Sequence, residues 1–120
     1  SVTGVQTCAL PIWNKDEWGP RSWMFLHLLA ITYKPEHKKE MIHRLRKFFR
    51  GIPCGECNAN AKKYCKENPP DLTDSISFQV WVFNFHNFKN KLLNKKTFSW
   101  KDYEYKYADA KEYFRSMPSH

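Results

Sequence analysis

The stretch "SISFQVWVFNFHNFKNKLL", residues 75–93, decides the fold class. Its large apolar side chains return every three or four positions, which is the period of a helix with one buried face rather than the alternation of a strand. We therefore predict a helix from about Ser75 to Leu93. Its inward face is expected to consist of Phe78, Trp81, Val82, Phe85, Leu92 and Leu93.

The segments on either side of this stretch also have helical periodicity. A first helix is expected from Asp16, as N-cap, to Ile31, with Pro20 in its first turn. The other expected helices run from after "YKPEHKK" (33–39) to Gly51, from Pro53 to about Asn68, and from the capping box of Ser99 and Asp102 to about Arg115. The expected inward residues are Trp23, Leu26, His27 and Ala30 in the first helix, and Met41, Leu45, Phe48 and Phe49 in the second.

These helices predict one all-α domain, a four-helix bundle with a short fifth helix capping one end. The domain is expected over residues 13–116, followed by a tail at 117–120. Residues 1–12 carry no charge and are expected to be a foreign or disordered lead. No run of the chain approaches the roughly 20 apolar residues of a membrane span.

The net charge of +8 points to three possible partners, namely nucleic acid, an anionic membrane or an acidic ligand. A lysine-rich solvated surface is the simpler interpretation. A nucleic-acid-binding helical module is the alternative function, and it would concentrate lysine and arginine on one helix, whereas here they are spread over four.

Cys54 and Cys57 are expected in the first turn of the helix that follows Pro53. Unpaired N–H groups and the positive end of the helix dipole favour a thiolate there, which suits thiol–disulfide exchange. A zinc site would need two further ligands, and Cys65 lies too far along the same helix to reach the same ion. We therefore interpret Cys54 and Cys57 as a redox pair on a helical scaffold. A zinc site and inert thiols are the alternatives, and no metal site is expected.

Two helices carry polar or small residues at four-residue spacing. His86, Asn90 and Asn94 recur in the 75–93 region and just beyond it, with Asn87 beside them. A second series in the first helix consists of Gly19, Trp23 and His27. A planar ligand with polar edges would explain both series, and a solvent-facing stripe is the alternative.

Three motifs together resemble the Erv/ALR family of FAD-linked sulfhydryl oxidases, in particular members encoded by large cytoplasmic DNA viruses of the African swine fever virus type. The motifs are "WGPRSWMFLH" (18–27), "IPCGEC" (52–57) and "WVFNFHNFKNKLLNKK" (81–96). The resemblance spans about Trp18 to Tyr107.

The resemblance implies roles for individual residues. Cys57 would be the thiol next to the flavin, and Cys54 would exchange with client thiols. The FAD-binding set it implies consists of Gly19, Arg21, Trp23, His27, Cys57, His86, Asn87, Asn90, Lys95, Trp100 and Tyr107.

It also implies a function and partners. Client protein dithiols would be oxidised through Cys54 and Cys57, then FAD, with O₂ as acceptor and H₂O₂ as product. A homodimer through the first two helices is implied, in the host cytoplasm or the virion. Cys8 is the one cysteine available as a distal shuttle, so a separate thiol carrier protein is a further expected partner. Cys65 lacks the partner cysteine that many relatives have.

Overall fold

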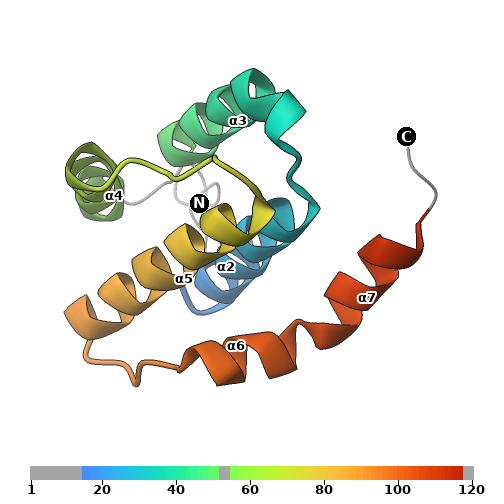
Figure 1. The fold of residues 1–120 in the computed structure, drawn as a ribbon. Helices are drawn as coiled ribbons and strands as arrows, with labels where there is room; N and C mark the ends of the chain where they lie inside the picture. Colours follow the sequence, from blue (N-terminus) through green and yellow to red (C-terminus); the bar gives the residue numbers. More distant parts are fainter. Residues whose placement is uncertain (1–14, 52–54, 118–120) are drawn as a thin grey trace, which may run out of the picture.

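Helix follows helix in the part of the chain that the computed structural model describes, residues 15–51 and 55–117 (Figure 1). In order, the elements are α2 (Lys15–Thr32), the 3-10 turn η2 (Pro35–His37), α3 (Lys38–Arg50), α4 (Gly55–Glu67), α5 (Ser75–Leu92), α6 (Trp100–Lys106) and α7 (Ala108–Ser116). These described ranges contain no strand, so the all-α prediction is confirmed for them. None of their helices combines the length and the apolar character that a membrane span requires.

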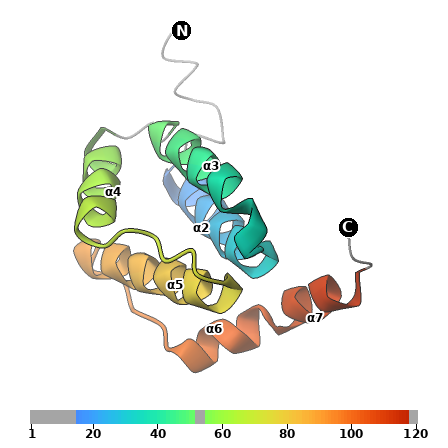
Figure 2. The same ribbon diagram turned by 45° about the horizontal axis from the view of Figure 1, so that its top comes forward.

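The helices α2 and α5 lie side by side and form the centre of the molecule (Figures 1 and 2). On one side of this pair, α3 and α4 contact each other, and on the other side α6 and α7 form a bent arm. The hydrophobic core follows the same division. A larger cluster lies among α2, α3, α4 and α5, and a smaller one around Ile31, Tyr103 and Tyr107 lies under α6 and α7.

Side-chain caps fix the starts of α5 and α6. Asp74 Oδ1 accepts a hydrogen bond from the Ser77 N–H at 2.7 Å. At α6, the Asp102 N–H donates to Ser99 Oγ at 3.1 Å, and the Ser99 N–H donates to Asp102 Oδ2 at 3.2 Å. The predicted capping box is therefore confirmed. Caps of this kind stabilise a helix by about 1 kcal/mol each.

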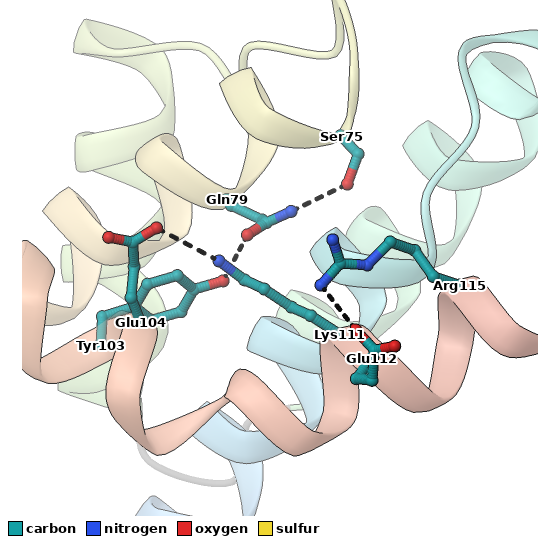
Figure 3. Close-up of polar contacts among 7 residues, drawn as sticks. All are labelled: Ser75, Gln79, Tyr103, Glu104, Lys111, Glu112 and Arg115. Atoms are coloured by element: carbon teal, nitrogen blue, oxygen red, sulfur yellow. Dashed lines mark hydrogen bonds and ion pairs between the residues drawn. The ribbon is translucent and has the colours of Figure 1, made fainter.

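A chain of buried hydrogen bonds fastens α6 and α2 to α5 (Figure 3). The Tyr103 hydroxyl donates to Gln79 Oε1 at 2.8 Å, and Gln79 Nε2 donates to Ser75 Oγ at 2.9 Å. Ser75 Oγ in turn donates to the Ala30 carbonyl near the end of α2, at 2.7 Å. Gln79 is 3% exposed, and these two partners satisfy its amide. Three helices are thus joined by one continuous polar link.

The predicted start of the first helix is wrong in two details. Because α2 already includes Lys15, Asp16 lies inside the helix and is not its N-cap. Pro20 is the sixth residue of α2 rather than a first-turn residue, so the helix lacks one of its backbone hydrogen bonds. The predicted start of the third helix at Pro53 lies outside the described residues.

Two predictions near the C-terminal part are also wrong. Leu92 and Leu93 are 51% and 56% exposed, because α5 ends at Leu92 and its last turn extends past the core. The single helix expected from Ser99 to Arg115 is two helices that meet at Tyr107, whose ψ of 12° departs from helical geometry. The bend keeps Tyr107 buried and packs Phe114 of α7 against the smaller cluster.

Candidate functional site

Two histidines from distant parts of the sequence meet between α2 and α5. His27 Nε2 and His86 Nδ1 are 3.1 Å apart and share one hydrogen bond, in which the tautomers decide the donor. His27 is 1% exposed and His86 is half-buried. The helical spacing that predicted His27 on the inner face of the first helix is confirmed.

Aromatic rings pack against the two histidines, and this cluster of side chains is here called the histidine pocket. The Trp23 ring stacks on the His86 ring at 4.2 Å with 8° between their planes. Phe98 meets the His86 ring edge-on at 4.9 Å. The rings of Tyr103 and Tyr107 lie beside His27, with their centres 5.2 and 5.0 Å from the centre of its ring. The pocket thus joins flat apolar faces to two polar rings.

Burial keeps both histidines neutral. Burial first, then His86 and Lys106, lowers the pKa of His27 to about 3. Burial first, then Lys106 and Lys95, lowers the pKa of His86 to about 4. At neutral pH each imidazole therefore has one nitrogen that carries a hydrogen and one nitrogen that can accept a hydrogen bond. The two rings together carry no charge.

One polar atom of the histidine pocket lacks a partner. His27 Nδ1 is buried and makes no hydrogen bond to any described residue. Leaving such an atom unpaired costs about 1–3 kcal/mol, so native structures rarely retain one without a reason. A bound molecule with a polar edge would remove this cost.

The asparagines near His86 have separate structural contacts. Asn87 Nδ2 donates to the Phe98 carbonyl at 2.8 Å, and Asn87 Oδ1 accepts from the Phe98 N–H at 3.1 Å. Asn90 Nδ2 lies 3.5 Å from Asn87 Oδ1. The two hydrogen bonds between Asn87 and the Phe98 backbone therefore hold Phe98 against the histidine pocket.

Asn94 ends α5. Its φ of 55° lies in the left-handed region, and the Lys95 N–H beyond it donates to the Asn90 carbonyl at 2.7 Å. This is the hydrogen bond of a Schellman-type helix end, in which asparagine is a common residue. The four-residue spacing of Asn94 thus reflects a helix terminus, and its side chain is exposed.

The remaining predicted residues lie at different distances from the histidine pocket. Gly19 is half-buried, and a Cβ added there would meet no atom within 4 Å, so there is open space beside it. Arg21 and Lys95 are exposed, and Lys95 is near enough to act on the pKa of His86. Trp100 packs against Tyr103, with 4.8 Å between the ring centres, and so is separated from the histidines by the Tyr103 ring.

The cysteines are only partly described. Cys54 lies outside the described residues, and Cys57 belongs to the first turn of α4. Cys65, two turns further along α4, is half-buried, and burial raises the pKa of its thiol to about 11. Among the side chains that the structure describes, no three of His, Cys, Asp and Glu come together as a metal site.

Sequence reasoning missed three residues around the histidine pocket. Phe98 and Tyr103 form two of its walls, and Gln79 holds Tyr103 in place. The four-residue spacing of Tyr103 and Tyr107 after the capping box was an available signal for Tyr103. Phe98 lies in a loop, where no periodicity could reveal it.

The chain belongs to the Erv1/Alr family, whose model matches residues 20–109. It is 42% identical over 97 residues to a FAD-linked sulfhydryl oxidase of African swine fever virus, which covers 78% of this chain and 82% of that protein. It is 31% identical over 99 residues to the mitochondrial FAD-linked sulfhydryl oxidase ERV1 of Saccharomyces cerevisiae, covering 79% of this chain and 52% of the yeast protein. A third relative, FAD-linked sulfhydryl oxidase ERV1 of Arabidopsis thaliana, is 33% identical over 71% of this chain and 47% of its own length.

Proposed function

We propose that this protein is a FAD-linked thiol oxidase that forms disulfides in client proteins. The observation that carries the proposal is the buried contact between His27 and His86, which joins two of the three motifs in one aromatic pocket. The third motif supplies Cys57, at the start of α4, and the family match over 20–109 includes all of these residues. The names of the viral, yeast and plant relatives support the same activity.

The histidine pocket fits FAD for two reasons. Flat rings, including the stacked pair Trp23 and His86, gather at the two histidines, and His27 Nδ1 is a buried polar atom in need of a partner. FAD accepts an electron pair from a dithiol and passes it to O₂, chemistry that no side chain supplies. The residues proposed to hold it are Gly19, Arg21, Trp23, His27, Cys57, His86, Asn87, Asn90, Lys95, Trp100 and Tyr107.

Cys54 and Cys57 take the electrons from the client. A client thiolate attacks the sulfur of Cys54, so that a client–Cys54 disulfide forms and Cys57 leaves as a thiolate. A second client thiolate then attacks the client sulfur of that bond, releasing the client as a disulfide and Cys54 as a thiol. In total the client loses two electrons and two protons, which reduce O₂ to H₂O₂. The N-terminal end of α4 favours the Cys57 thiolate.

Finer features of the assembly follow from the same proposal. The helices α2 to α5 form a four-helix bundle, with α6 and α7 as the capping segment. The protein forms a homodimer through α2 and α3, a proposal supported by the exposed Met24 and Phe25 on α2 and by the stacking of Phe25 on Phe48 of α3 at 5.6 Å. Light scattering that gave the mass of a single 14.4 kDa chain would contradict the dimer.

The proposed location and partners rest on the viral relatives and on redox chemistry. We place the protein in the cytoplasm of an infected cell or in the virion, since proteins of African swine fever virus are similar to it. A glutathione pool there reduces ordinary disulfides, so the electrons need an acceptor such as O₂ that removes them. A separate thiol carrier would pass electrons to Cys54 from clients that cannot reach it.

The experiment that tests the function compares three variants of the purified protein. The wild type is expected to be yellow and to produce H₂O₂ from dithiothreitol and O₂, and Cys57→Ser is expected to lose all turnover. Cys65→Ser is the matched control, because Cys65 lies in the same helix and burial keeps it a thiol, so this variant should turn over like the wild type. A folded, colourless protein that takes up no FAD, or an active Cys57→Ser, would refute the proposal.

A further inference from the structure

A groove of about 640 Å³ lies away from the histidine pocket, between α3, α4 and the segment 69–72. Its apolar lining includes Ile42, Leu45 and Phe49 of α3 and Leu72 of the segment. Its size is within the range of sites that bind small molecules or a few side chains of a partner. Figure 2 shows α3 and α4 at the side of the molecule opposite the bent arm of α6 and α7.

Basic side chains line the edges of this groove, here called the basic groove. They are Lys38, Arg46, Arg50, Lys62 and Lys66, and among the described side chains no carboxylate lines the groove with them. This concentration is a property of the two helices, since α3 carries six lysines and arginines and α4 three of the 20 in the chain. The lysines and arginines are thus spread over several helices, as expected, but α3 carries the most of them.

The five cations have no anionic partners among the described side chains. The two ion pairs found there join Lys111 to Glu104 and Arg115 to Glu112, all in α6 and α7 (Figure 3). Like charges gathered around an apolar floor repel one another, and a bound anionic partner would relieve that repulsion. An apolar floor with basic edges is complementary to a surface with apolar side chains at its centre and carboxylates around them.

The charge argues against one occupant that the chain itself could provide. Residues 1–12 of this chain carry no charged side chain and could not balance five cations. The floor argues against nucleic acid, because Phe49 is 9% exposed and offers no ring face for stacking a base.

We propose that the basic groove binds an acidic amphipathic helix of a client protein and so recruits the client to the cysteine pair. Lys62 and Lys66 of the groove lie on α4, the helix whose first turn contains Cys57. Lys62 is five positions after Cys57, about 8 Å along the helix axis. A segment docked there holds the client's dithiol near the redox centre. This inference rests on the proposed function, and it names the substrate class as proteins with an acidic amphipathic segment.

The test uses two labelled peptides of equal length, each with a Ser-Ala-Ala-Ser sequence followed by an amphipathic helix of about 15 residues. The apolar face is leucine in both, and the polar face is glutamate in one and lysine in the other. Fluorescence anisotropy measures binding without any redox chemistry. The wild type is expected to bind the acidic peptide and not the basic one, and binding should weaken as salt is raised.

Two double variants separate the basic groove from general charge. Arg46→Glu with Lys62→Glu reverses two cations of the groove and should raise the Kd of the acidic peptide about tenfold. Lys47→Glu with Lys63→Glu is the matched control, because these exposed residues follow the first pair by one position and do not line the groove. The control should change the Kd less than about twofold. If the first variant is unfolded by circular dichroism, Arg46→Gln with Lys62→Gln replaces it.

A kinetic measurement connects the basic groove to the reaction. With Cys-Ala-Ala-Cys in place of Ser-Ala-Ala-Ser, the groove variant should raise KM for the acidic peptide and leave dithiothreitol oxidation unchanged. A wild type that fails to oxidise dithiothreitol would refute the proposed function, while anisotropy would still test docking. Docking is overturned by equal binding of the two peptides, by equal losses in the two double variants, or by full displacement of the acidic peptide by a single-stranded DNA or by anionic vesicles.

Discussion

The histidine pocket, between α2 and α5, and the basic groove, between α3 and α4, treat charge in opposite ways. In the pocket, burial lowers the pKa values of His27 and His86 to about 3 and 4, so that two groups capable of charge are kept neutral. In the groove, five permanent cations surround an apolar floor, and no carboxylate of a described residue lies among them. A neutral, enclosed site suits a cofactor and its electron transfer, whereas an open charged one suits recognition of another protein.

The largest expected difference between the two regions concerns cofactor binding. His86→Ala removes both the ring that stacks on Trp23 and the partner of His27. His86 is also proposed to hold FAD, and loss of one hydrogen bond and one stacking contact to the cofactor costs about 2 kcal/mol, so the Kd of FAD should rise about thirtyfold. Quenching of flavin fluorescence on titration measures it.

The control for that experiment is the groove variant Arg46→Glu with Lys62→Glu, which should bind FAD like the wild type. If both variants lose FAD to the same extent, the two regions are not independent and the comparison fails.

Acid should lower the free energy of unfolding of the protein by a similar amount, through the histidine pocket. The folded pKa of His27 is below its usual 6.5, so its contribution to stability is complete above pH 6.5 and is lost as the pH falls toward 3. At pH 5 the protein without FAD should be about 2 kcal/mol less stable than at pH 7.5 from His27 alone. Urea unfolding at the two pH values measures the difference.

His27→Gln should remove the share of the pH dependence that comes from His27, while His86, whose pKa is about 4, should keep its own share. His43→Gln is its control, since His43 is exposed on α3. An unchanged pH slope in His27→Gln would show that the acid sensitivity comes from elsewhere in the chain.

The smallest expected effect separates the asparagines from one another. Asn94→Gly should change stability by less than about 0.5 kcal/mol, because glycine also adopts the left-handed conformation at a helix end. Asn87→Ala should weaken FAD binding through the loss of both hydrogen bonds to Phe98. Thermal melts and flavin titration of the two variants distinguish the roles, and a loss of FAD in Asn94→Gly would return Asn94 to the site.

Much of the fold could be predicted from the sequence because it depends on short-range patterns. Helical spacing identified Leu26, Ala30 and Met41 as buried, and the Ser99 capping box gave the start of α6. The errors arose where tertiary packing decides. Leu92 follows the apolar pattern of α5 but extends beyond the core, and the bend at Tyr107 depends on what α7 packs against.

The candidate site was predictable in its residues and not in its contacts. The motifs brought His27 and His86 into one hypothesis, but no spacing could show a hydrogen bond between residues 59 positions apart. The asparagines in and beside this series have two different roles, since Asn87 holds Phe98 and Asn94 lies at a helix end, and these roles look identical in a sequence. The basic groove was missed because its cations come from two helices and gather only when α3 and α4 pack together.

The polar link through Ser75, Gln79 and Tyr103 has a consequence for how the molecule opens. Because one buried amide ties α6 to α5 and α5 to the end of α2, these three helices should lose protection in amide hydrogen exchange as a single cooperative unit. The last helix, α7, has both of its ion pairs at partly or fully exposed positions, so its amides should exchange earlier. Tyr103, which is one wall of the histidine pocket, therefore belongs to the slowest-exchanging part of the protein. The following helix, α7, frays independently.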